Sequence, residues 1–309
     1  MKKIICFIVL IILIPVIITN SFFTYKISKI KMGFNENIKP DVTVKVLNKD
    51  DTISELNLED YLVGVVAAEV PVYFEEEALK AQAVAARTYA LKTKENNKDR
   101  EYDLTTTVST QVYKTDAELR SQWKENYVSN INKIKKAVKD TSGEYISYDN
   151  NPIYAFFFST SNGFTENNVN VFGQDLPYLK SVDSSFDLTE NKNSLVTKTI
   201  DLSEFYKLLN IEFSNDLKIS DINRSETGRI LSLKVNGVNF KGRDFQKLLS
   251  LRSNDISISQ DSDKVIITTK GFGHGVGMSQ YGANALAKQK KTYRDILEYY
   301  YIGTSLQKL

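Results

Sequence analysis

The stretch YLVGVVAAEVP (residues 61–71), followed by EEEALKAQAVAARTYA (residues 75–90), decides the fold. Its small and aliphatic residues predict two helices, one that stops at Pro71 and one that runs from about Glu75 to Lys94. Three glutamates in the first turn of the second helix complement the positive end of its dipole. Because small side chains allow helices to approach closely, we expect these two helices to pack in the core.

Outside these helices the chain mixes strand-like and helical segments, without a repeat of fixed period. Alternating apolar and polar residues at 42–46 predict a half-buried strand. The other expected elements are a charged helix between 117 and 137, strands at 145–148, 153–159, 229–235 and 264–269, and one or two helices within 279–301. A regular alternation of strand and helix is absent, so we predict an α+β fold.

The N-terminus carries a segment typical of a membrane anchor. Lys2 and Lys3 precede an apolar run over residues 4–23, which at about 1.5 Å per residue spans the ~30 Å hydrocarbon core, with a kink at Pro15. No Ala-x-Ala cleavage pattern follows, so we expect the helix to be retained. The positive-inside rule then places the rest of the chain outside the cytoplasm.

These features divide the chain into three parts. We expect residues 1–25 to form a cytoplasmic stub and a transmembrane helix, and residues 26–40 to form a basic juxtamembrane linker. Residues 41–309 are long enough to bury a large core. The prediction is one large globular extracytoplasmic region behind an N-terminal transmembrane helix.

Composition limits the chemistry that is available. The chain has 309 residues and a net charge of +2, which disfavours a nucleic-acid binder because such a protein needs a basic surplus. It contains one cysteine, Cys6, and one histidine, His274. A disulfide within the chain and a zinc site of several Cys and His residues are therefore excluded. We expect neither a metal nor another cofactor.

Glu69 is the one carboxylate in the apolar stretch 61–71. Burial there would raise its pKa and keep it protonated near neutral pH, as a general acid requires. Arg87 follows at the end of the run of small residues. Two interpretations stay open: Glu69 is catalytic, or it caps the helix or pairs with Arg87 and both residues are structural.

Two further segments contain candidate binding residues. The aromatic run at 156–158 passes into the polar loop STSNGFTEN at 159–167, which suits either sugar hydroxyls or a tight turn. The segment KGFGHGVGMSQYGA at 270–283 has four alternate glycines, which permit close approach to a ligand, but it lacks dinucleotide or phosphate-loop spacing. We expect His274, among these glycines, to face a cleft and, with a pKa near ~6.5, to donate a hydrogen bond.

In their order and combination these segments resemble the stage II sporulation protein D family, also called the amidase-enhancer family. The resemblance rests on residues 64–89, 159–166, 176–179, 228–253 and 271–282. It implies a membrane-anchored peptidoglycan lytic transglycosylase used in forespore engulfment, with residues 41–309 as the catalytic domain in the mother-cell membrane facing the forespore. Relatives act on glycan strands stripped of stem peptides, with a partner amidase and other membrane proteins.

The resemblance also assigns roles to residues. The catalytic acid maps onto Glu69, which we expect to cleave between N-acetylmuramic acid and N-acetylglucosamine and to leave a 1,6-anhydro end. One Glu suffices as acid and then base because the C6 hydroxyl of the substrate is the nucleophile, whereas ordinary glycosidases need two carboxylates. The residues expected to position the sugar are Arg87, Ser159, Tyr178, His274 and Gln280.

Two other functions stay open. One is a non-catalytic glycan-binding amidase enhancer, and the other is a two-carboxylate hydrolase with Glu166 as its second acid. The chain also departs from the family: relatives commonly carry His where Phe158 stands, and some hold zinc through Cys and His near residues 109–113, which here contain neither. We therefore expect no structural zinc.

Overall fold

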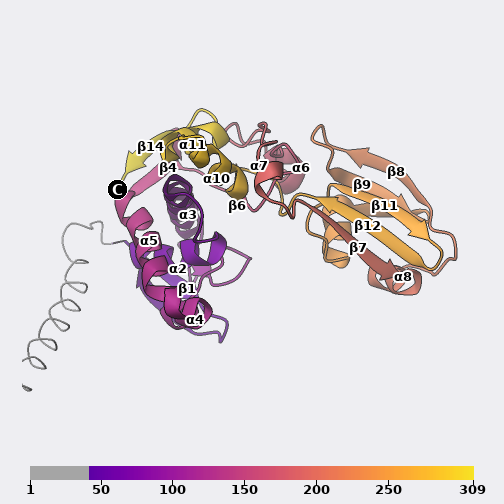
Figure 1. Cartoon of the computed structure of the whole chain (residues 1–309), viewed down its shortest axis with the longest axis horizontal. Coiled ribbons are helices and arrows are strands. Elements are labelled where there is room, and N and C mark those ends of the chain that lie inside the picture. The colour runs from indigo at the N-terminus through magenta and orange to yellow at the C-terminus, as the bar shows by residue number, and fades with distance from the viewer. Residues whose placement is uncertain (1–41) are drawn as a thin grey trace, which may run out of the picture. The chain divides into compact units, whose positions relative to one another are not determined.

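A computed structural model describes residues 42–309 as a mixture of helices and small sheets (Figure 1). The predicted α+β class is confirmed. The expected transmembrane helix and linker lie outside the described residues. Within residues 42–309, no helix combines the length and the apolar character needed to cross a membrane.

The first part of the described chain is mainly helical. Its elements are β1 (Thr43–Leu47), β2 (Ile53–Asn57), α2 (Leu58–Glu69), α3 (Glu76–Asn96), β3 (Leu104–Thr105), α4 (Asp116–Trp123), the 3₁₀ helix η1 (Lys124–Asn126), α5 (Tyr127–Asp140), β4 (Glu144–Tyr148) and β5 (Asn151–Pro152). Strand β1 pairs antiparallel with β2 and parallel with β3.

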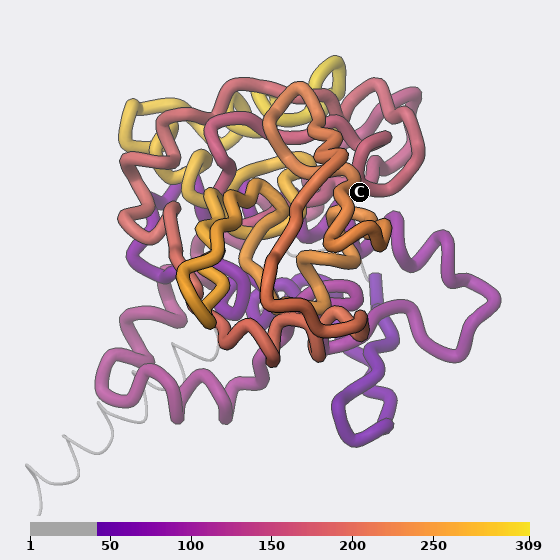
Figure 2. Tube along the Cα trace, turned by 90° about the vertical axis from the view of Figure 1, so that its right-hand side faces the viewer, coloured from indigo at the N-terminus to yellow at the C-terminus, as the bar shows by residue number. Residues whose placement is uncertain are grey.

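The second part contains most of the strands. Its elements are β6 (Phe157–Phe158), α6 (Asn168–Phe172), α7 (Asp187–Glu190), β7 (Leu195–Asp201), α8 (Leu202–Leu209), β8 (Ile219–Arg224), β9 (Ile230–Val235), β10 (Val238–Lys241), α9 (Gly242–Leu248), β11 (Ile256–Asp261), β12 (Lys264–Lys270), β13 (Met278–Ser279), α10 (Gln280–Lys288), α11 (Tyr293–Tyr300) and β14 (Ser305–Lys308). Two antiparallel sheets have the strand orders β10-β9-β8 and β11-β12-β7. In Figure 2 the strands from β7 to β12 are coloured in shades of orange, so that their path can be followed.

Two hydrophobic cores stabilise the described residues. The larger is built around α3, which contacts α2, α5, α10, α11 and β4 (Figure 1). The smaller lies within residues 200–267, where α8 and α9 cover the apolar sides of the two antiparallel sheets. The expected single globular region therefore contains two cores, because residues 195–270 bury their apolar side chains mostly against one another.

The packing of α2 on α3 follows the predicted pattern. Asn57 caps α2 by accepting the backbone N–H of Glu59 at 2.9 Å. The helix ends at Glu69, since Val70 takes an extended conformation before Pro71. Helix α3 buries an almost continuous run of alanines, so α2 can approach it closely.

A buried ion pair joins α2 to α3. Arg87 has no exposed surface; its Nε donates to Oε1 of Glu59 at 2.8 Å and its Nη2 to Oε2 at 2.6 Å. Its Nη1 donates to the carbonyl of Glu144 at 3.0 Å, and the N–H of Gly143 donates to Glu59 at 3.1 Å. The two side chains thus fix the start of α2, the middle of α3 and the turn between α5 and β4.

Arg87→Met should destabilise the fold strongly, because it leaves the carboxylate of Glu59 buried without its partner. The expected loss is about 3–5 kcal/mol of unfolding free energy, measured by urea denaturation. Arg120→Met is the matched control, since its ion pair with Asp116 is exposed, and it should change the unfolding free energy far less. Equal losses in the two variants would show that the buried pair has no special role.

Candidate active site

Glu69 lies at the carboxyl end of α2, where its half-buried side chain leaves the helix. The backbone N–H of Val112 donates to its Oε1 at 2.7 Å, so the loop before α4 closes against the carboxylate. The side chain of Gln280, at the start of α10, also hydrogen-bonds to Glu69. Three segments far apart in the sequence therefore converge on this carboxyl group.

The environment of Glu69 favours its protonated form. Burial raises the pKa of Glu69, and the hydrogen bonds from Val112 and Gln280 only partly oppose this effect. The direction of the shift expected from the apolar sequence is confirmed. A carboxyl group that holds its proton closer to neutral pH is suited to general acid catalysis.

Two amide side chains support this arrangement from α3 and α10. The Nε2 of Gln280 lies 3.5 Å from the Oε1 of Gln82, and both side chains are buried. Within residues 42–309 the Nε2 of Gln82 has no hydrogen-bond partner. Gln82 thus orients the amide of Gln280 that faces Glu69.

A cavity of about 300 Å³ lies near Glu69, which is not itself part of the lining. Tyr89 lines the cavity and also interacts electrostatically with Glu69. Burial is the main cause of the raised pKa of Tyr89, and the charge of Glu69 raises it further. The cavity is lined by Tyr89, Val108, Ser109, Thr110, Phe156, Phe157, Phe172, Arg243 and His274. Aromatic faces, an imidazole and a guanidinium make this lining suitable for a sugar ring.

His274 faces this cavity as an uncharged imidazole. The rings of Phe156, Phe158 and Phe172 surround it at centroid distances of 6.0, 5.7 and 5.4 Å. Burial, together with the positive charge of Arg243, lowers the pKa of His274 to about 4. The expectation of a cleft-facing residue is met, whereas that of a pKa near ~6.5 is wrong.

The alternate glycines serve a backbone contact within the chain. Gly277 has a φ of +78°, and a Cβ there would lie 2.0 Å from the carbonyl oxygen of Phe156. Thr160 and Phe272 exchange backbone hydrogen bonds at 3.0 and 2.7 Å, and β6 pairs with β13. The close approach predicted from the glycines is therefore to residues 156–160, and it holds His274 against the cavity.

Some of the remaining predicted binding residues lie in the region of Glu69, and others do not. Ser159 is half-buried near the start of α10, and its carbonyl accepts the N–H of Tyr281 at 3.1 Å. Tyr178 is buried in the larger core, where its hydroxyl accepts the N–H of Tyr154. Arg87 is enclosed by its ion pair. Ser159, His274 and Gln280 therefore belong to the region of Glu69, whereas Arg87 and Tyr178 have structural partners in place of a sugar.

Glu166 is bound on both of its carboxylate oxygens. It accepts hydrogen bonds from Ser225 at 2.6 Å, Asn170 at 2.9 Å and the N–H of Asn167 at 2.8 Å, and another from Thr227. Burial raises the pKa of Glu166, but these bonds outweigh it and the net shift is downward. An ionised, enclosed carboxylate of this kind is a poor general acid.

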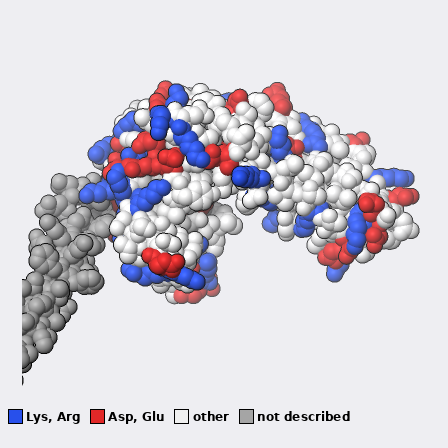
Figure 3. All heavy atoms as spheres, in the orientation of Figure 1, with Lys and Arg blue, Asp and Glu red and all other residues white. Residues whose placement is uncertain are grey.

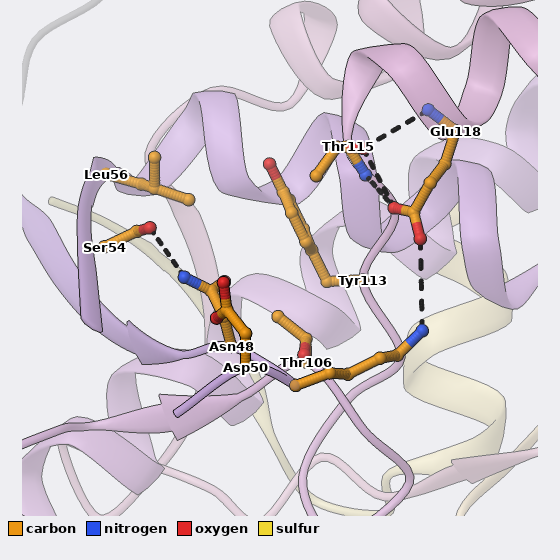
Figure 4. Close-up of a pocket in the computed structure, with 9 residues that line it drawn as sticks. Asn48, Asp50, Ser54, Leu56, Thr106, Tyr113, Thr115 and Glu118 are labelled. Carbon is orange, nitrogen blue, oxygen red and sulfur yellow. Dashed lines mark hydrogen bonds and ion pairs between the residues drawn. The ribbon is translucent and has the colours of Figure 1, made fainter. Parts of the chain in front are cut away.

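Another cavity, of about 570 Å³, contains none of the predicted site residues. It lies between the β1–β2 hairpin and the start of α4, with the ring of Tyr113 along one wall (Figure 4). Its polar side chains mostly bind one another, as Asn48 does with Ser54 at 2.8 Å and Thr115 with Glu118 at 2.9 Å. Glu69 is therefore the better centre for chemistry.

Charge on the described surface is mixed. Lys and Arg side chains alternate with Asp and Glu over the face seen in Figure 3, in keeping with the small net charge. Within residues 42–309 no group of three or more His, Cys, Asp or Glu side chains is placed to hold a metal ion.

Known proteins resemble this chain over most of its length. Residues 47–148 match the model of the "Stage II sporulation protein" family. Stage II sporulation protein D of Bacillus subtilis is 42% identical over 262 residues, which cover 83% of this chain and 76% of that protein. An uncharacterized protein of Brachyspira hyodysenteriae is 33% identical (82% and 67% covered), and the amidase enhancer of Bacillus subtilis is 30% identical (79% and 40% covered).

Gln280→Met should raise the pKa of Glu69 further, because the carboxylate loses a hydrogen bond that stabilises its charged form. An NMR titration of isotope-labelled glutamate carboxyl groups measures this, with the signal assigned by its loss in Glu69→Gln. Any activity that needs protonated Glu69 declines as pH rises through this pKa, so the decline should move to higher pH. Gln289→Met, at the exposed end of α10, is the control; an unchanged or lower pKa in Gln280→Met would refute the contact.

Chelation should leave the protein unaffected. Since residues 42–309 contain no cysteine and a single histidine, we expect EDTA to change neither the melting temperature nor the activity. A loss of stability in EDTA that zinc restores would contradict this expectation.

Proposed function

Since this chain belongs to the stage II sporulation protein D family, we propose that it is a sporulation protein that degrades the cell wall as a peptidoglycan lytic transglycosylase. Its substrate is the glycan strand stripped of stem peptides, cut between N-acetylmuramic acid and N-acetylglucosamine. The proposal includes an N-terminal membrane anchor, an extracytoplasmic catalytic domain on the mother-cell side, and a partner amidase in the engulfment complex.

One observation carries the proposal: Glu69 has no carboxylate among the groups that shift its pKa, which are the N–H of Val112 and the side chain of Gln280. Its burial favours the protonated acid, and the nearby cavity is also lined by no aspartate or glutamate. Hydrolysis by two carboxylates requires a second group about 5–10 Å away. A reaction that draws its nucleophile from the substrate needs only the one carboxyl group.

The reaction then proceeds with Glu69 in two roles. Protonated Glu69 gives its proton to the glycosidic oxygen as the bond from that oxygen to C1 of muramic acid breaks. The carboxylate left behind is stabilised by Val112 and Gln280. It then removes the proton of the C6 hydroxyl, whose oxygen attacks C1 and closes the 1,6-anhydro ring.

The neighbouring residues support the reaction in this proposal without transferring protons themselves. His274, uncharged with Nδ1 accepting the N–H of Val276 at 3.1 Å, keeps its proton on Nε2 and takes no part in proton transfer at neutral pH. Gln280 orients Glu69, and Ser159 holds the start of α10. Arg87 stabilises α2 through Glu59 and has no direct role in binding.

A second candidate is a glycan-binding module that stimulates an amidase without cutting glycan. The similarity to the amidase enhancer of Bacillus subtilis favours it. It predicts binding without cleavage, so the products of the reaction separate it from the transglycosylase.

Glu69→Gln should lower the yield of anhydro products from bare glycan strands by about 10²-fold or more, because the variant keeps its shape but loses the transferable proton. Mass spectrometry of the products measures this, and Glu204→Gln, an exposed carboxylate on α8, is the matched control. Near-normal yield from Glu69→Gln would refute the assignment. Absence of cleavage by the wild type would favour the amidase enhancer, and reducing ends would favour hydrolysis.

A further inference from the structure

We propose that Arg243 forms a carboxylate-binding subsite in the cavity near Glu69, which recognises the free lactyl carboxylate of a muramic acid residue. The subsite would make the protein prefer bare glycan over strands that carry stem peptides. This inference rests on the proposed function, because it names what the same site recognises.

Arg243 reaches the cavity from the other core. It belongs to α9, which packs within the smaller core, but its Nη1 donates to the carbonyl of Val171 in α6 at 2.9 Å. Its guanidinium lies over the ring of Phe172, 5.0 Å from the centroid. The side chain is therefore held at one nitrogen and one face, and its other N–H groups are available to a ligand.

Arg243 is exposed, and no carboxylate of the described chain balances its charge. Five of the eight arginines in residues 42–309 pair with carboxylates, namely Arg87, Arg120, Arg224, Arg229 and Arg294, whereas Arg100 and Arg252, like Arg243, do not. Within residues 42–309 Arg243 makes no such pair. The cavity lining includes no acidic residue, and His274 is uncharged. Arg243 is thus the only formal charge in the lining, and the complementary ligand is an anion.

The rest of the lining indicates that this anion is attached to a sugar. Phe156, Phe172 and Tyr89 offer aromatic faces, against which the apolar face of a pyranose packs. The hydroxyls of Ser109 and Thr110 bind within their own loop, to Thr105 and Thr107, so the aromatic faces and Arg243 are the groups left for a ligand. A volume of about 300 Å³ is on the scale of one substituted amino sugar.

The chemistry of peptidoglycan supplies such a group. Bare muramic acid carries a lactyl carboxylate, which a guanidinium binds through charge-assisted, often bidentate hydrogen bonds. In a strand with stem peptides the same carboxyl carbon is an amide, which has no charge to pair with Arg243. Removal of the peptide therefore creates the carboxylate that can pair with Arg243 in the cavity.

Binding to a form that does not cut the strand provides the test. Two ligands are compared: bare glycan strands, and the same strands with their lactyl carboxylates converted to methylamides. Each is titrated into the Glu69→Gln variant, and binding is measured by calorimetry. We expect the free acid to bind about 10-fold more tightly or better. Adding Arg243→Gln should abolish this preference by weakening only the free acid, and Arg243→Lys should restore part of it.

Lys247→Gln is the matched control, since it removes one positive charge from an exposed position one turn further along α9. It should keep the preference intact. The subsite would be overturned if the variant with Arg243→Gln still preferred the free acid. It would also be overturned if Glu69→Gln alone bound the free acid and the methylamide equally. The subsite and the proposed activity can fail separately. If the protein prefers the free carboxylate but the wild type cuts no glycan, the subsite stands and the transglycosylase is refuted. If the wild type cuts glycan but shows no preference for the free carboxylate, the transglycosylase stands and the subsite is refuted.

Discussion

The buried ion pair between Arg87 and Glu59 is the constraint on which the arrangement of the site depends. Glu59 starts α2 and Glu69 ends it, so whatever fixes the first turn of this helix also fixes the carboxyl group about 15 Å further along. Because Arg87 also binds the turn between α5 and β4, the helix cannot rotate without breaking several buried hydrogen bonds. A rigid helix whose last residue is the proposed acid positions that residue better than a loop would.

Three ionisable groups near the site illustrate how environment separates their roles. Glu69 is half-buried with few donors, so its pKa rises; Glu166 is buried among many donors, and its pKa falls. His274 lies among aromatic rings near Arg243, and it stays neutral. The three groups are therefore an acid that can give up a proton, a fixed anion and a neutral imidazole. A mechanism with a single carboxylate requires this division of tasks.

The sequence allowed prediction of what depends on neighbouring residues. The apolar stretch before Pro71 predicted the end of α2 and the direction of the shift at Glu69, and the alanine run predicted the packing of α3. Partners from distant segments were not predictable. No local pattern marks Glu59 as the partner of Arg87, and the buried position of Tyr178 follows from core packing that no local pattern reveals. Arg243 was missed because its helix belongs to the second core, and only the fold brings it to Phe172.

The central claim is that Glu69 works without a second carboxylate because the substrate supplies the nucleophile. Digestion of bare glycan strands in isotopically labelled water tests this most directly, since a hydrolase transfers the labelled oxygen to the new end and a transglycosylase does not. The account predicts 1,6-anhydro ends that carry no labelled oxygen. Labelled reducing ends would contradict it.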